Sequence, residues 1–236
     1  MALCVYLLAA AATPPRNPHP HKGILDKYER RPPSYYGMRV DKGIEARLLD
    51  GKAYVSKVDL PNGFRRTIAM KDVDAPPDIV FGQIIDVEGY PKKIDGVIGT
   101  RIYRDYRTLS GIRVFCAHYT VRFAAVVAES YVQHEIDPFS RCMTFQLDYS
   151  IKSDVADQVG YWYVEPLRNN RARVYYSVMS TVPFWVPKMM HGAVLDLVAK
   201  RSTSWVDVES RKEYAAKSSR WTAAFGAKMR KLKSRF

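Results

Sequence analysis

The feature that most constrains the fold is an alternation of apolar and polar residues that recurs between residues 96 and 181. In residues 113–125, for example, Phe115, Ala117 and Tyr119 alternate with more polar neighbours, which is typical of a strand with one buried face. Six such stretches predict consecutive strands over residues 96–106, 113–125, 130–136, 141–149, 160–165 and 171–181. Strands that follow one another through short turns form an antiparallel sheet.

One more strand and two short helices precede this series. Residues 64–73 predict the first strand, which stops at Asp74-Ala-Pro-Pro77, a turn that suits the start of a helix. Apolar residues at helical spacing predict a short helix over 78–85. Asp86 is placed to cap a second short helix that runs through Ile94.

A proline-rich break at 182–187 ends the series, and Pro187 starts a predicted helix to about Lys212. This order of elements predicts an α+β domain over 51–210, in which a curved antiparallel sheet of six to seven strands wraps around the long helix. Because the strand pattern is one-sided, the helix must cover the inner face of the sheet. A hollow between the sheet and the helix is then expected to be lined by large side chains, namely Phe81, Tyr90, Tyr149, Trp162, Tyr176, Trp185, Met190 and Val194.

The predicted inner faces carry few groups suited to catalysis. His118 and Arg122 fall on the polar face of their strand, and His134 stands beside a glutamate in a short strand, a pattern typical of a solvated sheet face. His191, near the start of the long helix, is the best candidate for proton transfer. The sequence has neither metal-ligand spacing nor a Gly-rich phosphate loop after a strand. We therefore expect no metal, no cofactor and no catalytic residue.

Two pairs of polar residues have structural interpretations. Asp154 and Asp157 flank a loop, and we interpret both as turn residues. Cys116 and Cys142 should lie two strands apart, which argues against a disulfide bridge between them.

The N-terminal part differs in composition from this domain. Residues 2–12 are uncharged, and Ala10 and Ala12 form a small-x-small pair of the kind found at signal-peptidase sites. We expect residues 1–12 to target the chain to the secretory pathway, a plastid or a mitochondrion, with a frayed apolar N-terminus as the alternative. Residues 13–50 are proline-rich with little periodicity, and we interpret them as an extended leader that contains His19 and His21.

Positive charge is concentrated at the C-terminus. The chain has 37 basic and 24 acidic residues, a net charge of +13. Residues 211–236 hold nine basic residues and one acid, which gives +8. This tail has an apolar helical face, so we expect either a solvated tail or contact with an anionic membrane. The residues expected at the membrane are Trp221, Phe225, Lys228 and Lys231. RNA is disfavoured, because aromatic and basic residues do not interleave on the outer face of the predicted sheet.

Several motifs occur in a characteristic order within residues 52–210. They include Val73-Asp-Ala-Pro-Pro-Asp-Ile-Val-Phe81, Gly160-Tyr-Trp-Tyr-Val-Glu-Pro166 and Thr203-Ser-Trp-Val206. Their order resembles the START-like (SRPBCC, helix-grip) superfamily, and most closely its coenzyme Q-binding and polyketide-cyclase-like branch. The resemblance implies a helix-grip fold. It does not identify the ligand, because the superfamily includes lipid and quinone carriers, polyketide cyclases and ribosome-associated proteins.

Three hypotheses for the function follow. The favoured one is a monomeric, non-catalytic carrier of a hydrophobic small molecule such as a lipid, a quinone or an isoprenoid, held by burial of apolar surface. The second is a polyketide cyclase or aromatase, in which His191 or a tyrosine hydroxyl moves a proton. The third is an RNA- or ribosome-associated regulator that uses the basic tail.

Overall fold

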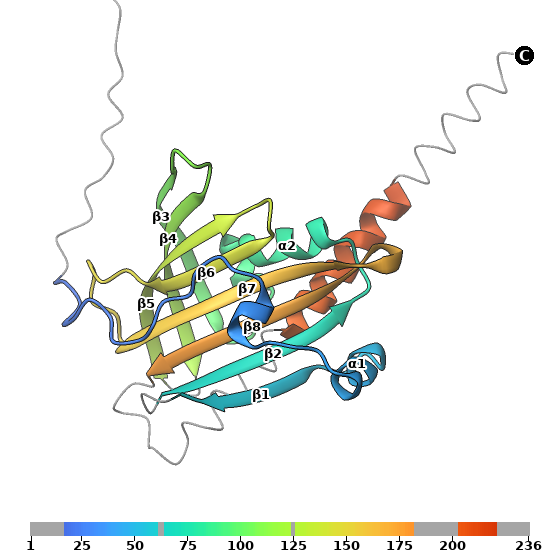
Figure 1. The fold of residues 1–236 in the computed structure, drawn as a ribbon. Helices are drawn as coiled ribbons and strands as arrows, with labels where there is room; N and C mark the ends of the chain where they lie inside the picture. Colours follow the sequence, from blue (N-terminus) through green and yellow to red (C-terminus); the bar gives the residue numbers. More distant parts are fainter. Residues whose placement is uncertain (1–16, 61–63, 124–125, 182–202, 221–236) are drawn as a thin grey trace, which may run out of the picture.

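The structure, a computed structural model, describes residues 17–60, 64–123, 126–181 and 203–220. Its centre is a curved antiparallel sheet with the strand order β1-β2-β8-β7-β6-β5-β4-β3, so that β1 and β3 are its edges (Figure 1). The eight strands are β1 (Tyr54–Asp59), β2 (Arg65–Val73), β3 (Val97–Arg107), β4 (Arg113–Phe123), β5 (Val126–Asp137), β6 (Cys142–Leu147), β7 (Asp157–Leu167) and β8 (Arg171–Thr181).

Short helices flank the sheet. The α-helices with described ends are α1 (Lys42–Leu49) and α2 (Pro77–Ile85), and the 3-10 helices are η1 (Pro33–Tyr36), η2 (Val87–Lys92) and η3 (Arg168–Asn170). Residues 203–220 are also helical, and we call them the C-terminal helix. The prolines that precede α2 have the role expected of them, because Pro77 occupies the first helical position, where its missing N–H is not needed.

The sequence predicts most of these elements. The strands expected between 96 and 181 are confirmed as β3 to β8, and the fold is the expected α+β architecture. The strand count was one too low, because β1 was not predicted. The side chains of this edge strand are only half-buried or exposed, so its sequence lacks a clear apolar alternation. Asp86 does precede η2, but its carboxylate accepts a 2.6 Å hydrogen bond from Lys93 Nζ instead of capping the helix.

The sheet is buried on both faces along its central strands. In β8, Val174 and Tyr176 belong to the core on one face, while Tyr175 and Met179 belong to a second core on the opposite face. The inner core includes α2, η2 and the C-terminal helix. The expectation of a one-sided strand pattern is therefore wrong for β7 and β8, whose residues are buried almost without interruption.

The second core is built with residues 17–50, which we call the strap. Figure 1 shows the strap running across β6, β7 and β8 on the face opposite the C-terminal helix. Its buried residues Leu25, Tyr28, Met38 and Leu48 pack with outward-facing side chains of β2, β6, β7 and β8. The sequence of this segment predicts only an extended leader. Most of its contacts come from widely spaced single side chains, although Val40, Ile44 and Leu48 recur at helical spacing in and just before α1.

Hydrogen bonds fix the strap to the sheet. Asp157, the fully buried first residue of β7, accepts the backbone N–H groups of Ile24 at 2.6 Å and Leu25 at 2.9 Å. Tyr28 shares a 2.7 Å hydrogen bond with Ser177 of β8. The interpretation of Asp157 as a turn residue was therefore incomplete, since its carboxylate is an anchor for a segment far away in sequence.

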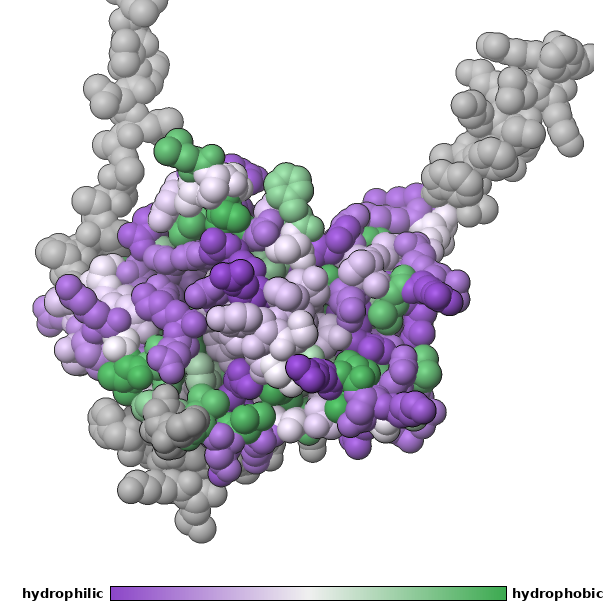
Figure 2. All heavy atoms as spheres, in the orientation of Figure 1, coloured by the Kyte–Doolittle hydropathy of each residue, from purple (hydrophilic) through white to green (hydrophobic). Residues whose placement is uncertain are grey.

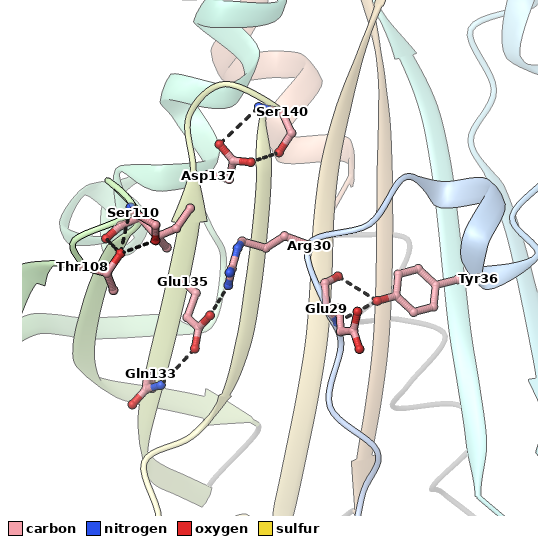
Figure 3. Close-up of polar contacts among 10 residues, drawn as sticks. Glu29, Arg30, Tyr36, Thr108, Ser110, Gln133, Glu135, Asp137 and Ser140 are labelled. Atoms are coloured by element: carbon pink, nitrogen blue, oxygen red, sulfur yellow. Dashed lines mark hydrogen bonds and ion pairs between the residues drawn. The ribbon is translucent and has the colours of Figure 1, made fainter.

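The outer surface of the strap is polar. Arg30 of the strap forms an ion pair with Glu135 of β5, as Figure 3 shows. Figure 2 shows a largely hydrophilic face over the strap with scattered hydrophobic spots, one of them at the tip of the β3–β4 hairpin, where Leu109 is fully exposed. Among the described residues, no helix is long and apolar enough to cross a membrane.

If the strap is part of the folded domain, truncating one of its core residues must destabilise the whole protein. We expect Leu48→Ala to lower the free energy of unfolding by about 2–4 kcal/mol, because Leu48 is fully buried. Its neighbour is the control: Leu49 is 62% exposed, so Leu49→Ala should change stability by less than about 0.5 kcal/mol. Urea denaturation measures both changes, and equal effects of the two substitutions would show that the strap is not part of the cooperative unit.

Candidate functional site

The inner face of the sheet carries a closed circuit of aromatic side chains. Each member contacts the next, and the last returns to the first across the C-terminal helix and η2. All are at least nine-tenths buried. In order, this aromatic circuit consists of Tyr90, Tyr119, His134, Phe145, Tyr176, Trp162 and Trp205.

Strand pairing positions the sheet members of the circuit. Trp162 of β7 and Tyr176 of β8 are direct cross-strand partners, and their ring centroids are 4.4 Å apart. Phe145 of β6 lies opposite Gly160 of β7. A Cβ atom on Gly160 would be only 1.9 Å from Phe145 Cζ, so the glycine allows the phenylalanine ring to lie across the neighbouring strand. Neighbouring centroids around the circuit are 4.4–6.5 Å apart, the range in which aromatic pairs attract each other.

The helical members close the circuit on the other side. Tyr90 of η2 donates a 2.5 Å hydrogen bond from its hydroxyl to the carbonyl oxygen of Ile84 in α2, which fixes its ring. Trp205 of the C-terminal helix meets Tyr90 edge-on, with centroids 5.1 Å apart, and lies 6.5 Å from Trp162. The helix contacts the sheet also through an ion pair between Lys71 of β2 and Asp207, at 3.3 Å.

One polar pair interrupts this aromatic surface. The Tyr119 hydroxyl and His134 Nε2 share a 2.8 Å hydrogen bond, and Phe115 stacks on the imidazole with centroids 4.5 Å apart. Burial lowers the pKa of His134 to about 3 and raises the pKa of Tyr119 well above its ordinary value. Both groups are therefore uncharged at neutral pH.

The second nitrogen of this imidazole has no partner. His134 Nδ1 is buried and makes no hydrogen bond. Leaving a buried polar group unpaired costs about 1–3 kcal/mol, and most native proteins avoid it. An atom of this kind beside an aromatic surface suggests a site whose hydrogen-bonding partner comes from outside the chain.

The structure brings together part of the predicted lining. Phe81, Tyr90, Trp162 and Tyr176 are buried in one core on the inner face. Tyr149 packs against this core but is not a member of the circuit: its ring contacts His19 and His21 of the strap, and its hydroxyl donates a 2.6 Å hydrogen bond to Asp157. The remaining predicted lining residues and the proton-transfer candidate lie outside the described residues, and they are Trp185, Met190, Val194 and His191.

Sequence reasoning missed four members of the circuit. Tyr119 and Phe145 lie on strand faces that were predicted to be buried, and Trp205 lies in the predicted helix, but none of them was assigned to the site. For His134 the expectation of a solvated face was wrong, since the residue is only 4% exposed. The available signal was its alternation with Val132 and Ile136, which places all three on the inner face.

The described residues offer little for metal or thiol chemistry. They contain no group of three or more His, Cys, Asp and Glu side chains placed to hold a metal ion. Cys116 and Cys142 are buried free cysteines, and burial raises the pKa of Cys142 to about 12, which keeps its thiol protonated.

Because His134 is buried in its neutral form, it must make the protein sensitive to acid. An unfolded chain binds a proton at this histidine below about pH 6.5, whereas the folded protein does so only near pH 3. Protonation of His134 therefore leaves the free energy of unfolding unchanged above about pH 6.5. Below that pH it lowers this free energy by about 1.4 kcal/mol per pH unit, until the pH reaches the folded pKa. Urea denaturation measures the free energy of unfolding at pH 7 and at pH 5. Between these two pH values it should fall by about 1–2 kcal/mol less in His134→Phe than in the native chain. Equal losses in the two proteins would mean that another group is responsible.

Comparisons with known proteins agree with this architecture. Human STARD10 is similar in structure with a TM-score of 0.55 at 11% sequence identity, over 72% of this chain and 73% of that chain. The Zhui aromatase/cyclase from a Streptomyces species gives a TM-score of 0.53 at 17% identity, over 63% and 94% of the two chains. A START superfamily protein from Mycobacterium smegmatis gives a TM-score of 0.53 at 15% identity, over 62% of this chain and 97% of that chain. At these identities the likeness shows the fold alone, which is the helix-grip fold.

The sequence itself matches a family model. No curated protein matches the chain significantly. Residues 73–204, more than half of the chain, match the model described as polyketide cyclase/dehydrase and lipid transport. The chain therefore belongs to the polyketide cyclase/dehydrase and lipid transport family.

Proposed function

We propose that this domain binds a hydrophobic small molecule, such as a lipid, a quinone or an isoprenoid, against the aromatic circuit and carries it without changing it chemically. The observation that supports this proposal most directly is the circuit itself. Its seven buried aromatic side chains come from five strands of the sheet and from two helices. Aromatic side chains with a few polar groups are the usual lining of small-molecule sites. Each square ångström of apolar surface that a guest buries contributes about 25 cal/mol.

The electrostatics of the circuit favour binding over catalysis. A general acid or base works best when its pKa lies near the working pH. The pKa of His134 is about 3, and burial moves that of Tyr119 further from neutrality, so neither group exchanges protons readily at pH 7. Tyr149, another residue considered for proton transfer, already donates its hydroxyl hydrogen to Asp157 outside the circuit.

A cyclase or aromatase is the second candidate, and one observation favours it. A hydroxyl and an imidazole in direct hydrogen-bonded contact, as in Tyr119 and His134, are groups that enzymes use to move protons. Cyclisation of a linear polyketide thioester by the full chain, lost in Tyr119→Phe, would support this candidate. Absence of turnover together with retained binding of the polyketide would favour the carrier.

A carrier should retain its guest through purification. We expect mass spectrometry of an organic extract of the full chain, purified from its native host, to show one hydrophobic compound near stoichiometric amounts. Trp162→Leu should raise the dissociation constant of this compound about tenfold and so lower the amount retained, because it removes aromatic contacts worth about 0.5–1.5 kcal/mol as well as buried area. Tyr163→Leu, on the opposite face of the same strand, should keep the native occupancy, and circular dichroism checks that both variants fold. A folded protein whose extract contains no such compound would contradict the proposal.

We also propose that the C-terminal tail contacts an anionic membrane. Within the described helix, Arg211 pairs with Asp207, and Lys212 and Lys217 have acidic partners of their own. The uncompensated charge is thus concentrated after Arg220, where the sequence has five basic residues and no acidic one. This part of the tail lies outside the described residues and includes the four expected membrane residues, Trp221, Phe225, Lys228 and Lys231.

The tail proposal is tested with vesicles of defined charge. The full chain should sediment with phosphatidylcholine vesicles that contain phosphatidylserine and remain in solution with pure phosphatidylcholine. A chain that ends at Arg220 should lose this binding, since each basic residue near an anionic surface contributes about 1 kcal/mol. Lys228→Gln/Lys231→Gln is the matched variant of full length, and it should bind more weakly. If the shortened chain binds equally well, the tail is not the contact, and a salt-sensitive shift of RNA by the tail would favour the regulator instead.

A further inference from the structure

The polar pair in the aromatic circuit has hydrogen-bonding capacity left over. Tyr119 and His134 are 9% and 4% exposed, so bulk water does not satisfy them. They satisfy each other through the 2.8 Å contact at His134 Nε2, while Nδ1 is buried without a partner. The pair therefore has at least one vacant hydrogen-bonding position inside an otherwise aromatic surface.

Both arrangements of the shared proton lead to the same conclusion. If Tyr119 donates to Nε2, then Nδ1 carries the imidazole hydrogen and is a free donor. If Nε2 donates instead, the Tyr119 hydroxyl hydrogen is the free donor and Nδ1 is an acceptor. In either case the pair offers a donor to an incoming oxygen atom, and a hydroxyl group could use the acceptor as well.

The charged residues near the inner face restrict which functional group of the guest can supply that oxygen atom. Lys71 is engaged by Asp207 of the C-terminal helix, at 3.3 Å, and by the Gly51 carbonyl oxygen, at 2.7 Å. Glu213 of the same helix accepts a hydrogen bond from Gln83 of α2. Among the described residues, the circuit itself contains no charged side chain, because its histidine is neutral. A carboxylate or phosphate would thus enter this surface without a counter-charge, which is strongly unfavourable.

Three tyrosine hydroxyl groups that lie beneath the strap are paired within the chain. Beneath the strap, Tyr28 bonds to Ser177, Tyr161 donates to the carbonyl oxygen of Arg31 at 2.7 Å, and Tyr175 donates to Glu165 at 2.7 Å. The vacancy at His134 lies instead on the face where the helices close over the sheet. The vacancy therefore lies within the aromatic circuit and away from the contacts that hold the strap.

We infer that the guest of the aromatic circuit carries an uncharged oxygen, a ketone, quinone carbonyl or hydroxyl group, that hydrogen-bonds to the Tyr119–His134 pair. The inference rests on the proposed function, because it specifies the chemistry of the molecule held at the same site. It excludes molecules that consist of hydrocarbon alone and molecules whose buried end is an anionic head group.

Three naphthalene probes of similar size test this chemistry. They are acetylnaphthalene, which has a neutral carbonyl, ethylnaphthalene, which has no oxygen, and naphthoate, which is an anion. Equilibrium dialysis against the full chain measures their dissociation constants. We expect the ketone to bind about tenfold more tightly than the hydrocarbon, a difference of about 1.4 kcal/mol, and naphthoate to bind more weakly than either.

Two tyrosine variants locate the contact. Tyr119→Phe removes one hydroxyl group while keeping the ring, and it should reduce the preference for the ketone without weakening the hydrocarbon, because the His134 imidazole N–H remains as a donor. Tyr163→Phe is the matched control on the outer face of β7, and the preference should survive in it. His134→Phe likewise leaves the Tyr119 hydroxyl as a donor and should only reduce the preference, whereas the double variant Tyr119→Phe/His134→Phe removes both donors and should abolish it.

Each result has a distinct meaning for the two proposals. If ethylnaphthalene binds as tightly as acetylnaphthalene, or if the double variant Tyr119→Phe/His134→Phe keeps the full preference for the ketone, the inference is wrong while the carrier function stands. If no probe binds, the compound extracted from the native protein decides: a neutral oxygen in it, with retention reduced in Tyr119→Phe, supports the inference, whereas a hydrocarbon or a buried anionic head group overturns it. If no probe binds and the extract is empty, both proposals fail.

Discussion

The central strands of this sheet are apolar on both faces, and this constraint determines the rest of the architecture. A strand that presents Val174 and Tyr176 to one side and Tyr175 and Met179 to the other cannot leave either side in water. The helices α2, η2 and the C-terminal helix cover one side, and the strap covers the other. The strap is therefore required by the sheet, although most of its sequence has no helical or strand periodicity.

The two coverings differ in kind. The strap is bonded closely to the sheet: buried Asp157 accepts two of its backbone N–H groups, and tyrosine hydroxyls from both partners find acceptors. On the same face, Arg173 and Asp72 form a buried ion pair with two hydrogen bonds of 2.6 and 3.0 Å. On the inner face the contacts are mainly between aromatic rings, and a buried nitrogen lacks a partner. The outer face is thus held by directional hydrogen bonds. The inner face, which depends on contacts between apolar rings, is better suited to replace one of those contacts with a contact to an apolar guest.

Much of the fold was predictable because it depends on periodic patterns. Alternation over residues 96–181 predicts β3 to β8, and Pro77 marks the start of α2. Most of the strap was not predictable in the same way, since Leu25, Tyr28 and Met38 pack on the sheet at irregular intervals. Among the site residues, Trp162 and Tyr176 follow from size and strand face. His134 was misjudged because its acidic neighbour Glu135, which is half-buried, was given more weight than its alternation with Val132.

The long sequence separations in the strap have a consequence for the order of folding. Ile24 reaches Asp157 across 133 residues, and Tyr28 reaches Ser177 across 149. During synthesis the strap is made first, yet its docking surface exists only after β7 and β8 have left the ribosome. Contacts between such distant residues close slowly, because the entropy of a long loop must be overcome before they form. Docking of the strap is therefore a late step of folding, and until it happens the outer side of β7 and β8 stays open to chaperones and to unwanted association with other chains.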